Sequence, residues 1–269
     1  MTPLAVAFVA REKFSWSLAS LRRLYALAGT PFTLYFVDGR YPHEARPGLE
    51  RFLADKDNVV RVEADRFLYP NEALNLVLER AQEPYILLLQ NDVLVARDAP
   101  AALLRAAQTR RCAVVAPVTL DAESGTPAPH REQEGARHFE MHCLLLELAA
   151  ARSVGPLPPL SVHEHIDLGE ALRGRGAEAC FEDSARALFL ASPPFPLRDF
   201  EQAYFRFRWD PARARLSQEH VRATWRLEAL VDTTQFVARQ QRALRPEGLL
   251  QRYASPFSDD LWDETLAPR

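Results

Sequence analysis

Lysine is scarce in this chain, and the chain carries no excess of positive over negative charge. Lys13 and Lys56 are the only lysines among 269 residues, so arginine supplies nearly all of the positive charge. This bias, together with abundant Ala and Pro, is typical of a GC-rich genome and indicates no function. The formal net charge is −3, whereas domains that bind nucleic acids are usually basic. We therefore expect no nucleic-acid partner.

Cysteines and long apolar runs are also few. Cys112, Cys143 and Cys180 are widely spaced and odd in number, which favours neither a disulfide framework nor a zinc cluster. We expect them to lie in the core as small apolar residues. No run approaches the roughly 18 apolar residues of a membrane span. The first apolar run stops at Arg11–Lys13 and follows no basic segment. We interpret it as a strand rather than a signal peptide, and expect a cytoplasmic protein.

Short apolar runs alternate with segments of helical periodicity through the first half of the chain. The expected strands are Leu4–Val9, Phe32–Val37, Val59–Val62, Tyr85–Leu89 and Cys112–Pro117. The expected helices are Phe14–Leu27, Gly48–Ala54, Asn71–Ala81 and Pro100–Thr109. Such β-α-β repetition predicts an α/β fold, in which helices cover both faces of a mostly parallel central sheet.

The second half is less regular. Asp121–Arg137 is rich in Gly, Pro and charged residues, and we expect a mobile loop of the kind that often covers an active site. Ser161–Arg175 is predicted to be a helix, and Ala179–Leu190 to hold one or two strands. The last part is Arg-rich, contains tryptophans and has a helical pattern. We therefore predict a main domain over residues 1–204 and a helical extension packed on it over residues 205–269.

The apolar run Tyr85–Leu89 ends abruptly on Gln90, Asn91 and Asp92. A run of this length without polar residues predicts a strand buried on both faces of a parallel sheet. Ligands bind at the carboxyl ends of such strands, and a carboxylate there could hold a divalent cation on a phosphorylated ligand. An ordinary Asn-Asp turn after a strand explains the same residues equally well.

Other polar residues are expected at the same edge of the sheet. Asp38 follows the second strand, and Asn71 and Asn75 lie on the helix after the third. Because the carboxyl ends of parallel strands converge, these side chains should lie near Asp92. Each also has a structural explanation: Asp38 suits a tight Asp-Gly turn, Asn71 a helix N-cap, and Asn75 the surface of a helix.

Residues able to exchange protons are dense at the start of the predicted helix Ser161–Arg175: His163, Glu164, His165 and Asp167. A capping box formed with Ser161 would explain Glu164, and the positive end of the helix favours Asp167. Neither effect explains the two histidines.

His142 lies on an apolar segment expected to run beside the same edge. His142, His163 and His165 could therefore gather near Asp92 as metal ligands or bases, although an isolated histidine is more often structural. His130 and His138 flank the predicted loop and are not assigned a role.

In order and spacing, these segments resemble the inverting nucleotide-sugar glycosyltransferases of the GT-A fold, family 2. The resemblance covers roughly residues 4–190 and implies a Rossmann-like architecture with a mostly parallel central sheet. The residues at the family's motif positions are Asp38, Asn75, Gln90-Asn91-Asp92, Glu164–Leu168, Arg173 and Gly176. The chain departs from the family at two positions. Gln90 replaces the first acid of the metal motif, and His165 replaces the acid that serves as general base.

The resemblance implies transfer of a sugar from a nucleotide-diphosphate sugar to the hydroxyl of a glycan, a lipid-linked or a small-molecule acceptor, with inversion. It assigns catalysis to Glu164 or His165 as the base and to Asp167; nucleotide or substrate binding to Asp38, Asn75, Asn91 and Arg173; and metal binding to Asp92. From their expected positions at the same edge, we add Asn71 as a binding residue and His142 and His163 as metal ligands. The metal would be Mg²⁺ or Mn²⁺, and histidine ligands would favour Mn²⁺.

Two other functions are consistent with the same segments. One is a non-catalytic GT-A-like module that binds a nucleotide or another protein, which Gln90 and His165 favour. The other is a sugar-phosphate nucleotidyltransferase, which we rank last because Ala10–Phe14 contains no Gly-rich loop. The Arg- and Trp-rich tail could cover the acceptor, but we favour a packing or homodimer surface.

Overall fold

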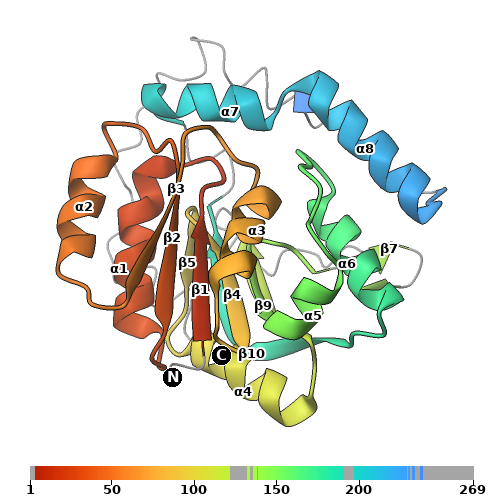
Figure 1. Ribbon diagram of the computed structural model, residues 1–269, viewed down its shortest axis with the longest axis horizontal. Helices are drawn as coiled ribbons and strands as arrows, with labels where there is room; N and C mark the ends of the chain where they lie inside the picture. Colours follow the sequence, from red (N-terminus) through yellow and green to blue (C-terminus); the bar gives the residue numbers. More distant parts are fainter. Residues whose placement is uncertain are drawn as a thin grey trace.

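An eight-stranded sheet forms the centre of the molecule (Figure 1). The computed structural model describes residues 4–121, 132–133, 136–137, 139–190, 197–228, 230, 232–233 and 237–238. The strands of this sheet lie in the order β3-β2-β1-β4-β9-β6-β10-β5. Their bounds are β1 Leu4–Val9, β2 Thr33–Gly39, β3 Val59–Ala64, β4 Tyr85–Gln90, β5 Val93–Val95, β6 Val114–Asp121, β9 Cys143–Glu147 and β10 Ala179–Phe189. A separate two-stranded sheet pairs β7 (Glu132–Gln133) with β8 (Ala136–Arg137).

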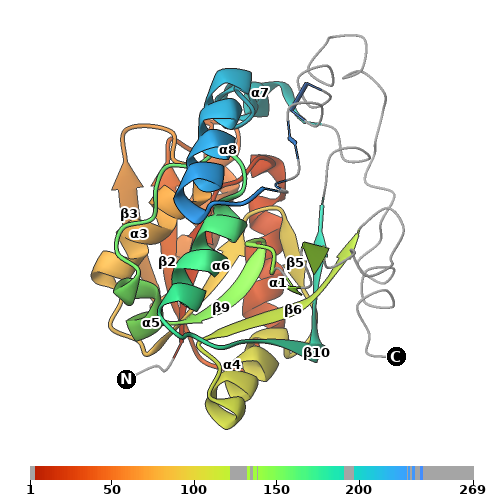
Figure 2. The same cartoon turned by 90° about the vertical axis from the view of Figure 1, so that its right-hand side faces the viewer.

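Helices cover both faces of the large sheet, as Figure 2 shows. Their bounds are α1 Ser17–Leu27, α2 Arg46–Ala54, α3 Pro70–Arg80, α4 Ala99–Arg110, α5 Leu148–Ser153, α6 Glu164–Gly174, α7 Gln202–Arg208 and α8 Pro211–Trp225, with short 3₁₀ turns at Phe14–Trp16 and Asp199–Glu201. One core holds residues of α1, α2 and α4, and the other holds residues of α3, α5 and α6. In the described ranges, no helix has both the length and the apolar character to cross a membrane.

The central strands are apolar throughout because both of their faces are buried. In β1, Leu4, Val6 and Phe8 belong to one core, and Ala5, Ala7 and Val9 belong to the other. The same alternation occurs in β4, and every residue from Ile86 to Leu89 is fully buried. Successive side chains point to opposite faces of a sheet, so a strand covered on both sides needs no polar positions. The prediction of a doubly buried strand at Tyr85–Leu89 is confirmed.

The sheet is mostly parallel but mixed. β1 pairs in parallel with β2 and β4, as do β2 with β3 and β6 with β10. β9 runs antiparallel between β4 and β6, and β5 runs antiparallel to β10. The predicted mostly parallel sheet is therefore confirmed. A doubly buried apolar run has the same pattern in either direction, so the sequence did not indicate the direction of β9 or β5.

Two predicted helix starts are corrected by the structure. α3 begins at Pro70 with Tyr69 as its N-cap, and Asn71 is already inside the helix. Proline suits the first turn because its missing N–H would have no partner there. α6 begins at Glu164 after His163, whose φ of 60° is left-handed. The predicted capping box is therefore absent from α6. The Ser161 backbone N–H instead donates to the Ser217 hydroxyl of α8 at 3.0 Å, and the two hydroxyls lie 3.3 Å apart.

The polypeptide after β10 crosses the carboxyl edge of the sheet. Figure 1 shows α7 above the ends of the strands and α8 continuing beyond α6. The predicted boundary between residues 204 and 205 falls inside α7, where Tyr204 and Phe205 are both fully buried. The division into a domain and an extension stays a prediction. Residues 239–269, and all of the predicted loop Asp121–Arg137 except Asp121, β7 and β8, lie outside the described residues, as do His130 and His138.

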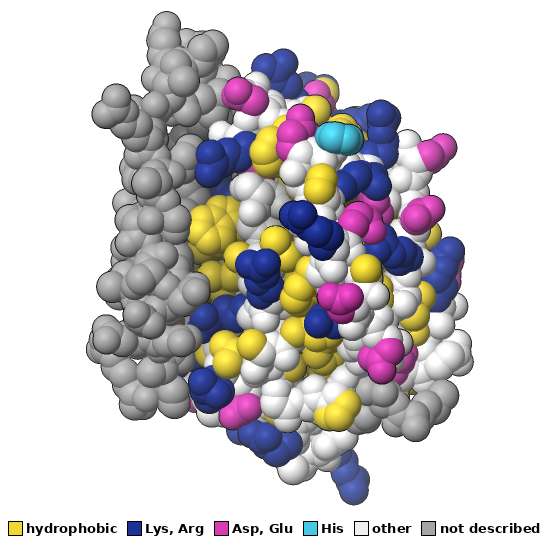
Figure 3. Space-filling view, turned by 90° about the vertical axis from the view of Figure 1, so that its left-hand side faces the viewer, with side chains coloured by type: hydrophobic (Ala, Val, Ile, Leu, Met, Phe, Trp, Pro, Cys, Tyr) yellow, Lys and Arg dark blue, Asp and Glu magenta, His cyan; other side chains and the backbone are white. Residues whose placement is uncertain are grey.

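Strand β3 forms one edge of the sheet and carries charged side chains. Arg61 and Glu63 are exposed there, and Arg61 forms an ion pair with Glu50 of α2. Charged side chains discourage an edge strand from pairing with another chain. Figure 3 shows this face of the molecule, where side chains of both signs are interspersed without a patch of one sign.

The cysteines lie in or near the cores. Cys112 and Cys143 are buried, as predicted, whereas Cys180 is only half-buried. All three are free thiols.

Candidate functional site

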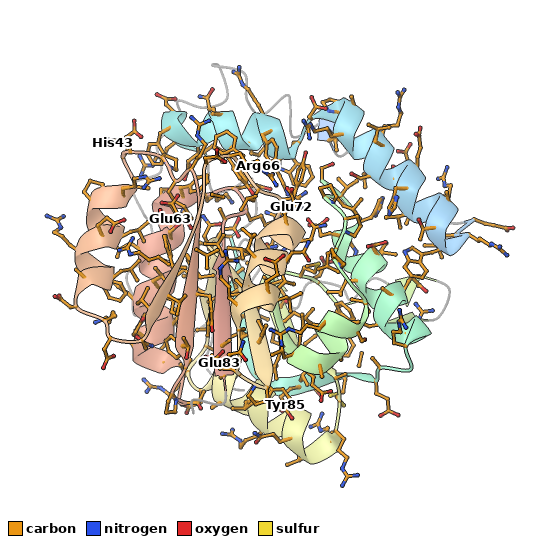
Figure 4. All side chains as sticks on the ribbon, in the orientation of Figure 1. His43, Glu63, Arg66, Glu72, Glu83 and Tyr85 are labelled. Atoms are coloured by element: carbon orange, nitrogen blue, oxygen red, sulfur yellow. The ribbon has the colours of Figure 1, made fainter. Side chains whose placement is uncertain are left out.

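The carboxyl ends of β2, β1 and β4, which are neighbours in the sheet, meet beneath α7. In Figure 4, Arg66 and Glu72 mark this edge, and Glu83 and Tyr85 mark the opposite one. An ion pair of 2.7 Å joins Arg66 to Glu72 and connects the segment after β3 with the first turn of α3. The described polar residues at the carboxyl edge form the candidate site.

Asn91 fastens the segment after β1 to the end of β4. Its backbone N–H donates to the Val9 carbonyl at 3.0 Å, and its Oδ1 accepts from the Arg11 backbone N–H at 2.8 Å. Its Nδ2 donates to the Ser17 hydroxyl at 3.1 Å. The side chain is buried and uses its amide for these bonds. Asn91 therefore holds the site together, and its predicted contact with a substrate stays a prediction.

Asp92 lies beside a guanidinium group. Arg11 Nη1 is 3.4 Å from Asp92 Oδ2 and 2.9 Å from Glu12 Oε1, so one nitrogen atom lies between two carboxylates. Within the described part of the chain, Asp92 Oδ1 has no hydrogen-bond partner. Burial raises the pKa of Asp92, and the attraction of Arg11 opposes this rise. The Arg11 guanidinium also lies over the Phe189 ring, 4.7 Å from its centroid.

Lys13 is a second buried cation at this edge. Its Nζ donates to the carbonyl of Leu190, and the Leu190 N–H donates to the Asp92 carbonyl at 3.0 Å. Burial lowers the pKa of Lys13 to about 8, while the attraction of Asp92 and Glu12 opposes the decrease. Lys13 is therefore mostly protonated at neutral pH.

His142 is held in the neutral form. Its ring stacks on Phe189 with the centroids 3.9 Å apart and the planes 7° apart, and its Nδ1 lies 2.9 Å from Gln90 Oε1. Burial, followed by the positive charge of Arg11, lowers the pKa of His142 to about 3. The amide oxygen can only accept, so Nδ1 carries the hydrogen.

The free energy of unfolding should decrease as the pH falls through the range in which His142 binds a proton in the unfolded state but not in the folded state. The unfolded value is about 6.5 and the folded value about 3, so the unfolded state gains stability between them. The side chain keeps 15% exposure, which moderates the effect, and we expect a loss of about 2 kcal/mol between roughly pH 7 and pH 4.5.

Urea unfolding measured across this pH range checks the expectation. His142→Gln should remove that part of the slope, and His220→Gln, which alters an exposed histidine of α8, should leave it unchanged. Equal slopes in wild type and His142→Gln would contradict the assignment.

Glu164 is paired with α7. The Arg208 Nη2 donates to Glu164 Oε1, and both side chains are buried, with exposures of 2% for Arg208 and 9% for Glu164. Burial alone would raise the pKa of Glu164, but the attraction of Arg208 and of His165 outweighs it and the pKa lies below its usual value. The neighbouring His165 is half-buried, and its ring centroid is 6.4 Å from that of His163.

Four predicted site residues use their side chains for hydrogen bonds or ion pairs within the protein. Asp38 accepts from the Tyr41 N–H at 2.8 Å and pairs with Arg46 at 2.8 Å. Asn75 exchanges two hydrogen bonds of 2.9 Å with the backbone of Leu157. Asp167 accepts from the Trp225 indole at 2.7 Å, and Arg173 pairs with Glu170 on the exposed end of α6. Asn71 is buried, and in the described ranges its Oδ1 has no hydrogen-bond partner.

The predicted metal ligands do not form a group in this structure. Among the described residues, no three His, Cys, Asp or Glu side chains lie together so that they could hold a metal ion. His142 is engaged by Gln90 and Phe189, and the charged neighbour of Asp92 Oδ2 is Arg11. The proposed set of Asp92, His142 and His163 is therefore not assembled.

Sequence reasoning missed the residues that α7 brings to the edge. The Tyr204 hydroxyl lies 3.1 Å from the Ala10 carbonyl and 2.7 Å from the Leu68 carbonyl, and the Trp209 indole donates to Glu12 at 2.8 Å. Tyr204 also lines a small pocket at the strand ends, together with Ala10, Val37, Gly39, Leu68 and Ala73. Arg11 and Glu12 could have been found, because they follow a buried strand as Asp92 does. Nothing in the local sequence marks Tyr204 or Trp209 as partners of β1.

Comparisons of sequence find no matching protein-family profile and no matching curated protein. Comparisons of structure find a mannosyltransferase from Pyrobaculum calidifontis in complex with GDP-Man and Mn²⁺, at a TM-score of 0.58 and 11% identity over 98% of this chain and 84% of that one. TarS residues 1–349 from S. aureus match at 0.58 and 14% identity over 84% and 69%. The same protein with UDP-GlcNAc matches at 0.57 and 14% identity over 84% and 70%. The matches confirm the predicted GT-A fold.

Proposed function

We propose that this chain is a glycosyltransferase that moves a sugar from a nucleotide-diphosphate donor to an acceptor hydroxyl with inversion. The observation that supports it most is the position of Arg11 at the carboxyl edge, where its Nη1 lies 2.9 Å from Glu12 and 3.4 Å from Asp92. This edge is where α/β sheets bind ligands. Structural matches that hold GDP-Man or UDP-GlcNAc support a nucleotide sugar as the donor.

Inverting transfer needs a base on the acceptor side and positive charge on the donor side. The acceptor oxygen forms a bond to the anomeric carbon, while the bond from that carbon to the diphosphate oxygen breaks and its electron pair stays on the oxygen. The acceptor proton goes to a base. Glu164 is buried behind Arg208, so we assign the base to the half-buried His165, since imidazole exchanges protons near neutral pH. Glu164 and Asp167 then position the start of α6.

A divalent cation, predicted as Mn²⁺ or Mg²⁺, fits the described residues poorly. Mg²⁺ takes oxygen ligands, but Asp92 Oδ2 faces a guanidinium nitrogen at 3.4 Å. Gln90, in the place of a second acid, directs its amide oxygen to His142. We therefore derive no step of the reaction through a metal.

The donor would enter beneath α7, near Asp38 and Asn71. Tyr204 lines a small pocket there together with Ala10, Val37, Gly39, Leu68 and Ala73, and its hydroxyl bonds to the carbonyls of Ala10 and Leu68. The proposal therefore includes a movement of α7 when the nucleotide binds. The contact of Asp38 with the nucleotide requires Arg46, whose side chain is 41% exposed, to turn toward solvent.

The proposal is tested by calorimetric titration with UDP, GDP, CDP and dTDP, followed by donor hydrolysis assays with the sugar nucleotides of the base that binds. We expect one base to bind and its sugar nucleotide to be hydrolysed slowly without acceptor. Failure of every nucleotide to bind would contradict the proposal.

A second candidate is a non-catalytic GT-A module that binds a nucleotide. The Glu164–Arg208 pair and the buried Tyr204 favour it, because both occupy the edge with the chain's own groups. Binding of a sugar nucleotide without hydrolysis, and without transfer to any acceptor screened, would identify this module.

A further inference from the structure

A single atom of Arg11 occupies the position between the two acids of the carboxyl edge. Nη1 contacts Glu12 Oε1 at 2.9 Å and Asp92 Oδ2 at 3.4 Å. Glu12 comes from the segment after β1, and Asp92 from the end of the neighbouring β4. Both carboxylates are buried, with side-chain exposures of 2% and 0%. Removing two such groups from water is unfavourable unless a positive charge lies between them.

Two positive and two negative formal charges balance at this position, as two carboxylates would balance a divalent metal ion. Arg11 and Lys13 supply two positive charges, and Glu12 and Asp92 supply two negative ones. Lys13 is fixed beside this group by its bond to the Leu190 carbonyl. A divalent cation added at Asp92 would meet the guanidinium at short range, where like charges repel strongly.

The Arg11 guanidinium is also held in a fixed orientation, in which two of its nitrogen atoms keep N–H groups for a ligand. The guanidinium carbon lies 4.7 Å from the centroid of the Phe189 ring, and the Arg11 backbone N–H donates to Asn91 Oδ1 at 2.8 Å. The side-chain hydrogen bonds of Arg11 to the described residues all use Nη1. Nε and Nη2 therefore have N–H groups for the oxygens of a phosphate, which arginine binds in a two-pronged manner.

We propose that Arg11 takes the place of the divalent cation and stabilises the diphosphate that leaves the donor. This inference rests on the proposed glycosyl transfer and adds the group that binds its leaving group. When the bond between the anomeric carbon and the diphosphate oxygen breaks, the electron pair stays on that oxygen. Arg11 donates hydrogen bonds to the diphosphate and keeps its proton, while the acceptor proton goes to His165.

Calorimetric titration of the full chain with UDP and with GDP, each in EDTA and in Mn²⁺, tests the inference without any substitution. We expect the nucleotide that binds to have affinities that agree within about twofold in the two buffers, since a cation supplied by the chain is not removed by a chelator. A gain of roughly tenfold or more with Mn²⁺ would overturn the inference and leave glycosyl transfer standing. No binding of any nucleotide in either buffer would overturn both.

The variant Arg11→Ala provides a second test, in which Mn²⁺ is expected to change the nucleotide affinity. In EDTA it should weaken binding by about ten- to a hundredfold, the usual effect of losing hydrogen bonds to a charged group. It also frees Glu12 and Asp92, so Mn²⁺ should restore much of the affinity and should bind the variant without nucleotide. Arg22→Ala, an exposed arginine on α1, should behave as wild type. Wild-type affinity of Arg11→Ala in EDTA would contradict the role of Arg11.

Discussion

Replacement of Arg208 by methionine should lower the free energy of unfolding by about 3–5 kcal/mol, the usual effect of leaving one member of a buried ion pair without its partner. Arg208 is 2% exposed and bonds to Glu164, whose carboxylate is 9% exposed. Without the guanidinium, Glu164 must either stay charged in the interior or take up a proton. Methionine fills much of the space of the arginine stem, so the effect reports the charge more than the packing.

Chemical unfolding of three variants separates this effect from general damage to α7. Arg206→Met makes the same substitution at an exposed position of the same helix and should change stability by no more than about 0.5 kcal/mol. The double variant Glu164→Gln/Arg208→Met removes both charges and should recover a large part of the loss. A double variant as unstable as Arg208→Met would show that packing, rather than the unpaired carboxylate, causes the loss.

Replacement of His165 by alanine should reduce turnover by about 10²–10⁴-fold, the usual contribution of a positioned general base. This expectation depends on the proposed glycosyl transfer. His165 follows Glu164 at the start of α6 and is half-buried, so an acceptor can reach it more readily than Glu164. Nucleotide affinity should change little, because the base acts on the acceptor and not on the donor.

Steady-state kinetics with the donor identified by titration check this prediction. The decrease should appear in kcat rather than in the KM for the donor, and added imidazole should restore part of the activity. His220→Ala, an exposed histidine on α8, should keep wild-type kinetics. A His165→Ala variant with full turnover would remove His165 from the reaction.

The strands were predictable because burial on both faces makes them continuous apolar runs. Leu4–Val9 is found with the predicted bounds, and Tyr85–Leu89 extends by one residue to Gln90. Strand direction was not predictable, since the apolar residues of β9 fit an antiparallel strand as well as a parallel one. Helix starts also depended on partners outside the local sequence: Ser161 bonds to Ser217 of α8, and His163 takes the N-cap position of α6.

The edge that holds the site was predictable, but the partners of its residues were not. The carboxyl ends of β2 and β4 lie on either side of β1, with Asp38 in β2 and Asp92 two residues after β4. The bonds of Asn75 to Leu157 and of Glu164 to Arg208 join positions 82 and 44 residues apart. Hydrophobic periodicity describes which face of an element is buried, and it contains no information on such polar pairs.

Helix α7 bonds at once to three parts of the molecule that are separate in the chain. Tyr204 bonds near β1 and α3, Arg208 to α6, and the adjacent Trp209 to Glu12. Any displacement of α7 from the edge would break these bonds together. If the proposed donor binds beneath α7, it would supply the free energy of this displacement, and its measured Kd would exceed the intrinsic Kd of the open site by the inverse of the open fraction. Variants that loosen α7 would then bind the donor more tightly while being less stable.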